Sequence, residues 1–314
     1  MHRQPRLALL LLAGACSSAP DPAARAPDTL LVYEAASLSG PMRAALDTFA
    51  RRTGARITEE HGASLELARR ITELDRNPDV VALADHEVFP ELLLPFAAAW
   101  YATFARNRMV VAYTGRSRYA SEITADNWRT ILQRPDVLLG RTDPVLAPAG
   151  YRALLMYKLA ESHYHDPGLA ARLEARTPPR LQRGNAAELA ALLAAGELDY
   201  IIEYESLARA QNFNMIRLPA AIDLGDPGSA ATYAGASVRI GSGDRAQTRR
   251  GAPILYGVSV PRRAPHGAAG VHFLQFLLGR EGRAILRAAQ VDALERPEFF
   301  GDSVPPVLRM RTAP

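Results

Sequence analysis

Three times along this chain, a short apolar segment is followed by a turn of small residues and then by the start of a helix. The composition of residues 30–33 predicts a strand, residues 35–40 are too small and polar to continue it, and Pro41 suits the first turn of a helix. The pattern returns at residues 55–74 and at residues 137–162. Strands that alternate with helices in this way predict an open α/β sheet.

Each of these turns is chemically suited to hold an anion. The N–H groups at a helix start have no partner within the helix, and they lie at the positive end of its dipole. The hydroxyls of Ser37 and Ser64 lie at two of the helix starts, and the N–H of Ala149 lies at the third. Capping of the first helix by Ser37 or Ser39 is the ordinary alternative. Because ligands of open sheets collect at the carboxyl ends of the strands, two hydroxyl-bearing turns favour one shared binding site.

The rest of the chain continues the alternation and predicts two lobes. Further strands are expected at residues 79–83, 109–113, 198–203 and 254–260, and further helices from Asp85 and at residues 123–132, 187–195, 271–278 and 281–289. A chain of 314 residues with 48% hydrophobic content can bury two cores. We expect residues 29–112 and 254–309 to form the first lobe and residues 113–253 the second, joined by a hinge. Residues 225–243 are expected to be an irregular surface region, with Tyr233 near the cleft.

The N-terminus carries an export signal. Residues 1–6 are positively charged, residues 7–12 are apolar, and small residues precede Cys16, the single cysteine of the chain. This order is typical of a lipoprotein signal peptide at residues 1–16 with Cys16 as the acylated residue, and an ordinary signal with an incidental cysteine is the alternative. Residues 17–28, rich in Ala, Pro and Asp, are expected to form a flexible tether. The folded part is therefore expected on the periplasmic side of a membrane.

Composition and motifs argue against several other classes of protein. The formal net charge is +4, of which Arg3 and Arg6 supply two, and the arginines are scattered, so nucleic-acid binding is not expected. No later apolar run approaches the ~20 residues of a membrane span. No GxSxG elbow, CxxC pair or P-loop is present, so we predict neither an enzyme nor a cofactor. His163, His165 and Asp166 could hold a divalent metal, although a solvated turn is the ordinary alternative.

Seven segments, taken in order, resemble one known family. They are residues 35–42 (AASLSGPM), 62–74 (GASLELARRITEL), 78–85 (PDVVALAD), 107–128 (NRMVVAYTGRSRYASEITADNW), 148–155 (PAGYRALL), 194–208 (AAGELDYIIEYESLA) and 252–261 (APILYGVSVP). Over residues 31–306 the chain resembles the periplasmic molybdate- and tungstate-binding proteins of ABC importers, especially their tungstate-type branch. The resemblance implies a two-lobed type II periplasmic-binding-protein fold, in which two open mixed sheets flanked by helices enclose a tetrahedral oxyanion.

The resemblance also implies which residues bind. It makes the hydroxyls of Ser37 and Ser64 the ligands from the first lobe. In the second lobe it makes the N–H groups of Ala149 and Ala186 the donors, and the hydroxyl of Tyr204 completes the shell. A partly buried ring with a satisfied hydroxyl is the ordinary alternative for Tyr204.

Two carboxylates can also bind the metal centre in the tungstate-type branch, raising its coordination from four oxygens to six. One falls on Glu203, for which a structural ion pair with an arginine is the alternative, whereas the other position is Ala147 here and the nearest acid is Asp143. A carboxylate beside a dianion is repelled unless it is protonated, hydrogen-bonded or bonded to the metal. We therefore expect at most five-coordination, and a tetrahedral site if Glu203 points away.

The sequence thus predicts a lipid-anchored, monomeric solute-binding protein that closes on molybdate or tungstate and delivers it to an ABC permease. One alternative is another oxyanion, sulfate or phosphate; protonated phosphate would need an acceptor, which Glu203 or Asp143 could supply. The alternative from a different class is a ligand-sensing receptor component.

Overall fold

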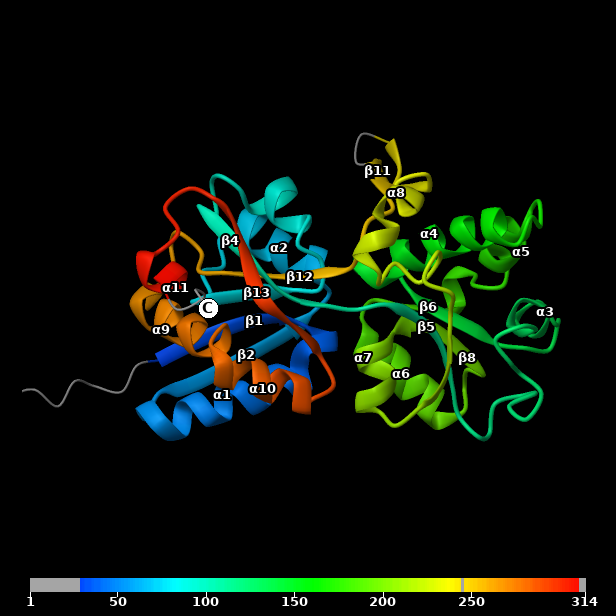
Figure 1. Ribbon diagram of the computed structural model, residues 1–314, viewed down its shortest axis with the longest axis horizontal. Coiled ribbons are helices and arrows are strands. Elements are labelled where there is room, and N and C mark those ends of the chain that lie inside the picture. Colours follow the sequence, from blue (N-terminus) through cyan, green and yellow to red (C-terminus); the bar gives the residue numbers. More distant parts are fainter. Residues whose placement is uncertain (1–28, 244–245, 311–314) are drawn as a thin grey trace, which may run out of the picture.

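The computed structural model describes residues 29–243 and 246–310, which form two lobes side by side (Figure 1). Each lobe is built on its own open sheet of mixed strand direction, flanked by helices. The two-lobed α/β fold expected from the sequence is therefore confirmed. Cys16, the signal peptide and the tether lie outside the described residues.

The sheet of the first lobe has the strand order β13, β4, β12, β3, β1, β2. The strands are β1 (Thr29–Ala35), β2 (Arg56–Gly62), β3 (Val80–Leu83), β4 (Trp100–Arg106), β12 (Leu255–Ser259) and β13 (Asp292–Gly301). β1 pairs in parallel with β2 and β3, while β12 is antiparallel to β3 and β4. The register places Ala35 opposite Gly62, so β1 and β2 end at the same level and their turns emerge side by side.

The sheet of the second lobe has the order β7, β6, β8, β5, β9. The strands are β5 (Met109–Tyr113), β6 (Leu139–Thr142), β7 (Gln182–Arg183), β8 (Tyr200–Tyr204) and β9 (Asn214–Arg217). β6 and β8 are parallel, so their carboxyl ends share one edge of the sheet. β5 pairs with β8 and β9, whereas the expected boundary at residue 113 assigned it to the first lobe. The chain thus changes sheet between β4 and β5.

A separate two-stranded hairpin stands on the second lobe, made of β10 (Ser237–Ile240) and β11 (Gln247–Arg250). The expectation of an irregular region over residues 225–243 is therefore wrong for its last part. The strand signal was weak because β10 has only four residues, of which Ile240 alone is buried, and its single partner is β11.

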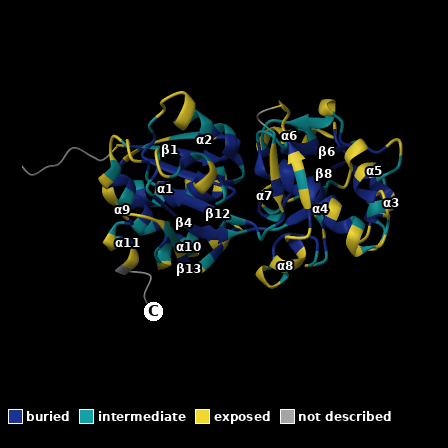
Figure 2. Ribbon diagram, turned by 90° about the horizontal axis from the view of Figure 1, so that it is seen from above, coloured by how far each residue is buried: buried dark blue, intermediate teal, exposed yellow. Residues whose placement is uncertain are grey.

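Helices cover the sheets and turn their exposed residues outward, while buried residues gather in the middle of each lobe (Figure 2). Those of the first lobe are α1 (Ser39–Thr53), α2 (Ser64–Glu73), α9 (Gly267–Leu277), α10 (Arg280–Ala288) and α11 (Pro306–Met310). Those of the second are α3 (Trp128–Leu132), α4 (Pro148–His163), α5 (Leu169–Ala175), α6 (Ala186–Ala195), α7 (Glu205–Ala210) and α8 (Ala230–Tyr233). In the described part of the chain, no helix has both the length and the apolarity that crossing a bilayer demands.

Two expected helices differ from the structure. The segment from Asp85 forms turns and then a single π-helical turn, Phe89–Leu93, which contains Pro90. The helix expected at residues 123–132 shortens to α3, because Asn127 and the residues before it form side-chain-stabilised turns: its Oδ1 accepts the N–H of Thr124 at 2.7 Å.

The start of α4 is set by its first three residues. Pro148 takes the first helical position, where its missing N–H costs nothing. Gly150 lies so close to the end of β6 that an added Cβ would be 2.5 Å from the carbonyl oxygen of Thr142. This close approach brings the N-terminus of α4 against the turn that follows β6.

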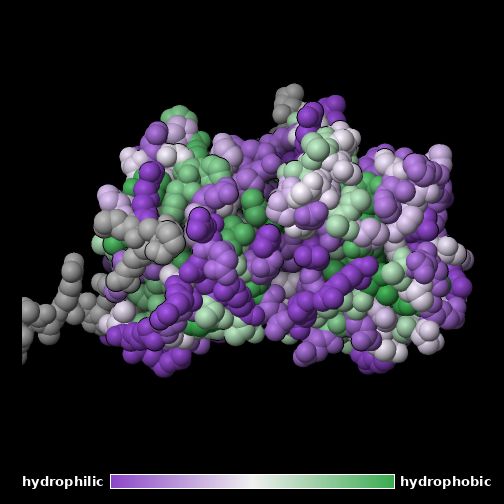
Figure 3. All heavy atoms as spheres, viewed as in Figure 1, coloured by the Kyte–Doolittle hydropathy of each residue, from purple (hydrophilic) through white to green (hydrophobic). Residues whose placement is uncertain are grey.

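Hydrophilic residues line much of the boundary between the lobes on the face shown in Figure 3.

Candidate functional site

A small cavity lies where the two lobes meet, at the carboxyl ends of strands from both sheets. Its volume is about 20 Å³, roughly the space of one water molecule. It is lined by Ala35, Ala36, Ser37, Gly62, Ala63, Ser64, Ala84, Thr142, Ala147, Pro148, Ala149, Asn185, Ala186, Glu203 and Tyr204. All six residues predicted to bind a ligand are in this lining, so the structure brings them together, and their role in binding stays a prediction.

Ser37 reaches the cavity from the short 3₁₀ turn Ala36–Leu38 that connects β1 to α1. The alternative that Ser37 or Ser39 caps α1 is wrong, because Leu38 is the N-cap residue and makes no side-chain cap. The Ser39 hydroxyl instead donates to the carbonyl of Ala36 at 3.0 Å. Ser37 is therefore held in the lining by the turn itself and not by a capping bond.

Ser64 is the first residue of α2 and is 1% exposed. Its Oγ accepts the N–H of Ala84, from the end of β3, at 3.0 Å. Because the oxygen is used as an acceptor, its proton remains available to be donated to a group inside the cavity.

The second lobe contributes two helix N-termini. Ala149 is the second residue of α4, and Ala186 is the first residue of α6. N–H groups at these positions have no acceptor within their own helix. Asn185 caps α6, since its side chain accepts the N–H of Glu188 at 3.0 Å. The N–H of Ala186 takes no part in this hydrogen bond, and Ala186 lines the cavity.

Glu203 is the second-last residue of β8, and its side chain is fully buried. Its Oε1 accepts the N–H of Tyr204 at 2.9 Å, while Oε2 has no hydrogen-bond partner among the residues that the structure describes. No ion pair involves Glu203 within residues 29–243 and 246–310, so the arginine alternative is not what holds it there. Burial raises the pKa of Glu203 to about 8. At neutral pH the group is therefore mainly a neutral acid, which does not repel an anion.

Tyr204 lies at the same edge, and its hydroxyl is engaged. It accepts a hydrogen bond from Nη1 of Arg152 at 3.0 Å and lies 3.5 Å from the carbonyl oxygen of Ala84. The long contact to Ala84 binds the phenolic proton only weakly. Tyr204 thus combines the two expectations for it, a buried ring with a partnered oxygen and a proton that can turn toward the cavity.

A buried ion pair joins the lobes beside the cavity, and sequence reasoning missed it. Nη2 of Arg152, in α4, lies 2.9 Å from Oδ1 of Asp85, which follows β3. The hydroxyl of Tyr151 donates to the other oxygen of Asp85. The backbone also joins the lobes, because the N–H of Leu65 donates to the carbonyl of Leu146 at 3.3 Å. Asp85 and Arg152 both lie in segments that resemble the family, residues 78–85 and 148–155. Nothing in the sequence indicates that the two residues form a pair.

Thr142 was also missed. It ends β6, lines the cavity and is 0% exposed, and its Oγ1 has no hydrogen-bond partner in the described part of the chain. A hydroxyl at the carboxyl end of a parallel strand was the available signal.

Of the positions considered for a carboxylate at the metal centre, only Glu203 places a carboxyl group in the cavity lining. Ala147 lines the cavity and presents only a methyl group. Asp143 is absent from the lining, and its Oδ1 accepts the N–H of Val145 at 2.7 Å within its own turn. The suggestion that Asp143 could accept the proton of a bound phosphate is therefore wrong, and Glu203 is left as the only carboxyl group in this lining.

Other residues singled out in the sequence lie elsewhere. Tyr233 is buried in the second lobe, where its hydroxyl accepts the N–H of Asp226 at 3.1 Å, and it does not approach the cavity. His163 and His165 are exposed, and Asp166 pairs with Arg172 at 2.6 Å. Across the described residues these three do not come together as a metal-binding group, which supports the solvated-turn interpretation.

Comparisons with known proteins agree on one class. The family described as bacterial extracellular solute-binding protein matches residues 30–289. The molybdate/tungstate-binding protein WtpA of Thermococcus kodakarensis is 34% identical over 301 residues, covering 87% of this chain and 84% of that protein. An uncharacterized solute-binding protein of Petrotoga mobilis is 37% identical over 272 residues, covering 86% of this chain and 85% of that protein.

A solved structure shares the fold. The periplasmic molybdate-binding protein of Azotobacter vinelandii superposes with a TM-score of 0.62 at 17% identity, over 83% of this chain and 98% of that protein. These relatives and this neighbour are solute-binding proteins and not enzymes, so the prediction that the chain is not an enzyme is confirmed.

The buried Glu203 predicts a pH dependence of stability. Its pKa is about 8 in the folded protein against an ordinary value of 4.5, so between these pH values the folded state keeps a proton that the unfolded state releases. Raising the pH from 5 to 8 should therefore destabilise the ligand-free protein through this group by on the order of 1 kcal/mol per pH unit. Urea unfolding at pH 5, 6.5 and 8 should show a smaller loss for Glu203→Gln than for the parent. The exposed control Glu73→Gln should follow the parent, and equal losses in all three proteins would contradict a buried neutral acid.

Proposed function

Because the chain belongs to the bacterial extracellular solute-binding proteins, we propose that it binds molybdate or tungstate between its lobes and delivers the anion to an ABC permease. The observation that carries the proposal is the composition of the cavity wall. Residues that carry hydroxyl and N–H donors line one shared space from both lobes, with Ser37 and Ser64 on one side and Ala149 and Ala186 on the other. A tetrahedral anion with four oxygens matches donors that converge from two sides.

The size of the cavity argues against an organic solute. With the lobes in contact its volume is about 20 Å³, so the lobes would have to move slightly apart even to enclose a tetrahedral oxyanion. No arginine or lysine is among the lining residues, so the anion would be held by neutral donors and by the positive ends of two helices. Closure would strengthen these hydrogen bonds by excluding water, and only the closed form would present both lobes to a transporter.

Metal coordination in this site would be limited by Ala147. Where the tungstate-type branch carries a carboxylate, this chain has a methyl group, so the metal would gain at most one extra oxygen, from Glu203. If Glu203 keeps its proton, its unpartnered Oε2 can donate to an oxygen of the anion and the centre stays tetrahedral. No cofactor other than this ligand is proposed.

Another oxyanion, sulfate or phosphate, is the alternative ligand. Phosphate keeps a proton near neutral pH and needs an acceptor, which sulfate, molybdate and tungstate do not. The free oxygen of Glu203 could accept that proton if the carboxyl group were ionised. A ligand-sensing receptor component is the alternative from another class, and deletion of the gene would then leave uptake of the anion intact.

A panel of anions tests the proposed ligand. We expect tungstate and molybdate at 100 times their dissociation constants to stabilise the protein by about 2.7 kcal/mol, and sulfate and phosphate at the same concentrations to stabilise it much less. Thermal unfolding of the residue 29–314 protein in each anion gives the measurement. Stabilisation by phosphate alone would support the alternative, and no shift with any of the four anions would refute oxyanion binding.

The serines test the location of the site. Ser64→Ala and Ser37→Ala should each weaken anion binding roughly tenfold or more, because each removes one hydrogen bond to a charged group. Ser39→Ala is the matched control, since its hydroxyl bonds to Ala36 and lies outside the cavity lining. Calorimetric titration measures the three dissociation constants. Parent-like affinity in both Ser37 and Ser64 variants would place the ligand elsewhere.

We also propose that the protein is attached to the membrane through lipid on Cys16, and that it acts as a monomer. The support is the small-residue sequence before a single cysteine at the end of an apolar segment. Cys16→Ser should move the protein from the membrane fraction to the soluble extracytoplasmic fraction, measured by immunoblotting after fractionation. Unchanged membrane association would argue for a different attachment.

A further inference from the structure

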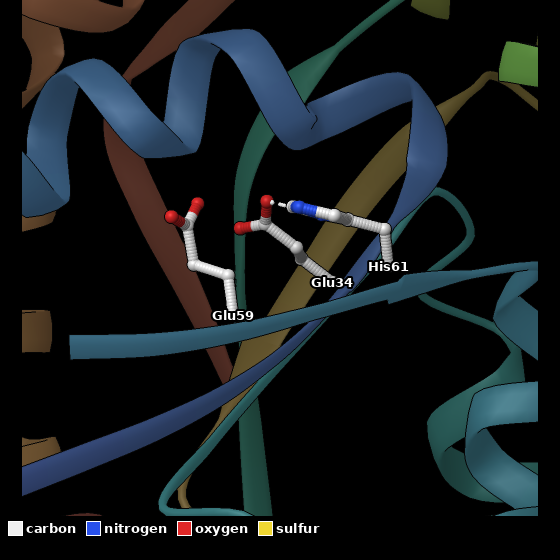
Figure 4. A group of neighbouring side chains, drawn as sticks. All are labelled: Glu34, Glu59 and His61. Atoms are coloured by element: carbon white, nitrogen blue, oxygen red, sulfur yellow. Dashed lines mark ion pairs between the residues drawn. The ribbon is translucent and has the colours of Figure 1, made fainter.

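A second polar cluster lies in the first lobe, outside the cavity lining. It consists of Glu34 on β1 and of Glu59 and His61 on β2 (Figure 4). The parallel register pairs Glu34 with His61 and Val32 with Glu59. Because side chains alternate along a strand, all three polar groups point to the same face of the sheet. One donor atom from each residue lies within 4.8 Å of the others.

Glu34 is the member whose environment needs explanation. Its side chain is 0% exposed, and its Oε1 lies 2.9 Å from Nδ1 of His61. Its Oε2 has no hydrogen-bond partner within the described residues. Burial raises the pKa of Glu34 to about 7, and the contact with Glu34 raises the pKa of His61. Glu34 therefore places a buried carboxylate oxygen without a hydrogen-bond partner next to an imidazole nitrogen.

Glu59 adds a second free oxygen. Its Oε2 pairs with Nη2 of Arg43 at 3.0 Å, but its buried Oε1 is without a hydrogen-bond partner in the part of the chain that the structure describes. Figure 4 shows the carboxyl groups of Glu34 and Glu59 side by side, with the ring of His61 reaching Glu34. The two carboxylates thus have one guanidinium group, that of Arg43, beside them. Burying carboxylate oxygens that have no partner costs free energy unless a cation binds them.

We propose that Glu34, Glu59 and His61 bind one divalent transition-metal ion, with Zn²⁺ as the best match. One imidazole and two carboxylates form a ligand set that zinc accepts, with water in the fourth position. Mg²⁺ and Ca²⁺ fit less well, because they prefer six or more oxygen ligands. Ligand atoms around a tetrahedral zinc lie about 3.3 Å apart. The Glu34–His61 pair already has nearly this spacing, and the ligand atom of Glu59 lies within 4.8 Å of both.

A metal ion bound by this cluster would lie close to the two turns that carry Ser37 and Ser64. Glu34 precedes Ser37 by three residues, and His61 precedes Ser64 by three residues. A bound ion would therefore join β1 to β2 just before the two turns that carry the cavity hydroxyls. The inference does not rest on the proposed function, because metal uptake can be measured in the absence of any oxyanion.

Titration with ZnCl₂ tests the proposal. Tag-free protein, stripped with a chelator, would compete for zinc with a chromophoric chelator in a buffer without phosphate. We expect one zinc per chain, and an affinity at least about tenfold weaker in Glu34→Gln and in His61→Ala. Zinc should raise the thermal midpoint of the parent and of neither variant. Glu60→Gln and His163→Ala are controls, since Glu60 contacts Arg70 on the other face of the sheet and His163 is exposed.

The outcomes separate a metal site from an ordinary buried pair. Absence of saturable one-to-one uptake by the parent, or parent-like affinity in both variants, would overturn the proposal. If Glu34→Gln fails to fold by circular dichroism, His61→Ala decides, because that side chain is already 33% exposed. Anomalous diffraction at the zinc edge should place the ion between Glu34 and His61, and a peak at His163 instead would overturn the assignment.

Discussion

The closed geometry of the cavity depends on the buried ion pair between Asp85 and Arg152. Asp85 belongs to the first lobe and Arg152 to the second, and their side chains are 0% and 4% exposed. Such a pair adds little net stability, because desolvation offsets most of the attraction. Its effect is geometric: Arg152 also donates to the carbonyl of Ala84 and to the hydroxyl of Tyr204, so one guanidinium orders groups from both lobes around the same space.

In this arrangement the charged side chains of Asp85 and Arg152 lie outside the cavity lining. The lining holds hydroxyls, backbone N–H groups and one carboxyl group that burial keeps neutral at pH 7. Backbone N–H groups can only donate hydrogen bonds, whereas hydroxyls and a neutral carboxyl group can also accept them, so this lining is rich in donors without carrying a full charge. The helix starts at α4 and α6 add partial positive charge without a mobile side chain. In the proposed complex, Ala147 and Glu203 would limit the metal centre to at most one additional oxygen ligand.

Much of the fold could be predicted from local patterns, and the failures have physical causes. β4 and β13 were not expected: β4 is almost wholly buried, so its alternation is lost, and β13 lies at the sheet edge with a register shift at its centre. β5 carried a clear strand signal but could not be assigned to a sheet, since its partners β8 and β9 lie about a hundred residues later. The site residues Ser37, Ser64 and Ala149 followed from turn chemistry, whereas Ala186, Glu203 and Tyr204 were expected only through the family resemblance.

The sequence by itself determined the alternation of strands and helices, the small-residue turns and the donors they carry, because these depend on hydrophobic period, glycine, proline and hydroxyl residues close together in the chain. Only the tertiary structure decided which turns share a cavity, that Arg152 pairs with Asp85 and that Glu203 is neutral. It also placed Thr142 in the lining and gathered Glu34, Glu59 and His61. These properties arise from burial and from contacts between residues tens of positions apart, and no local pattern encodes either one.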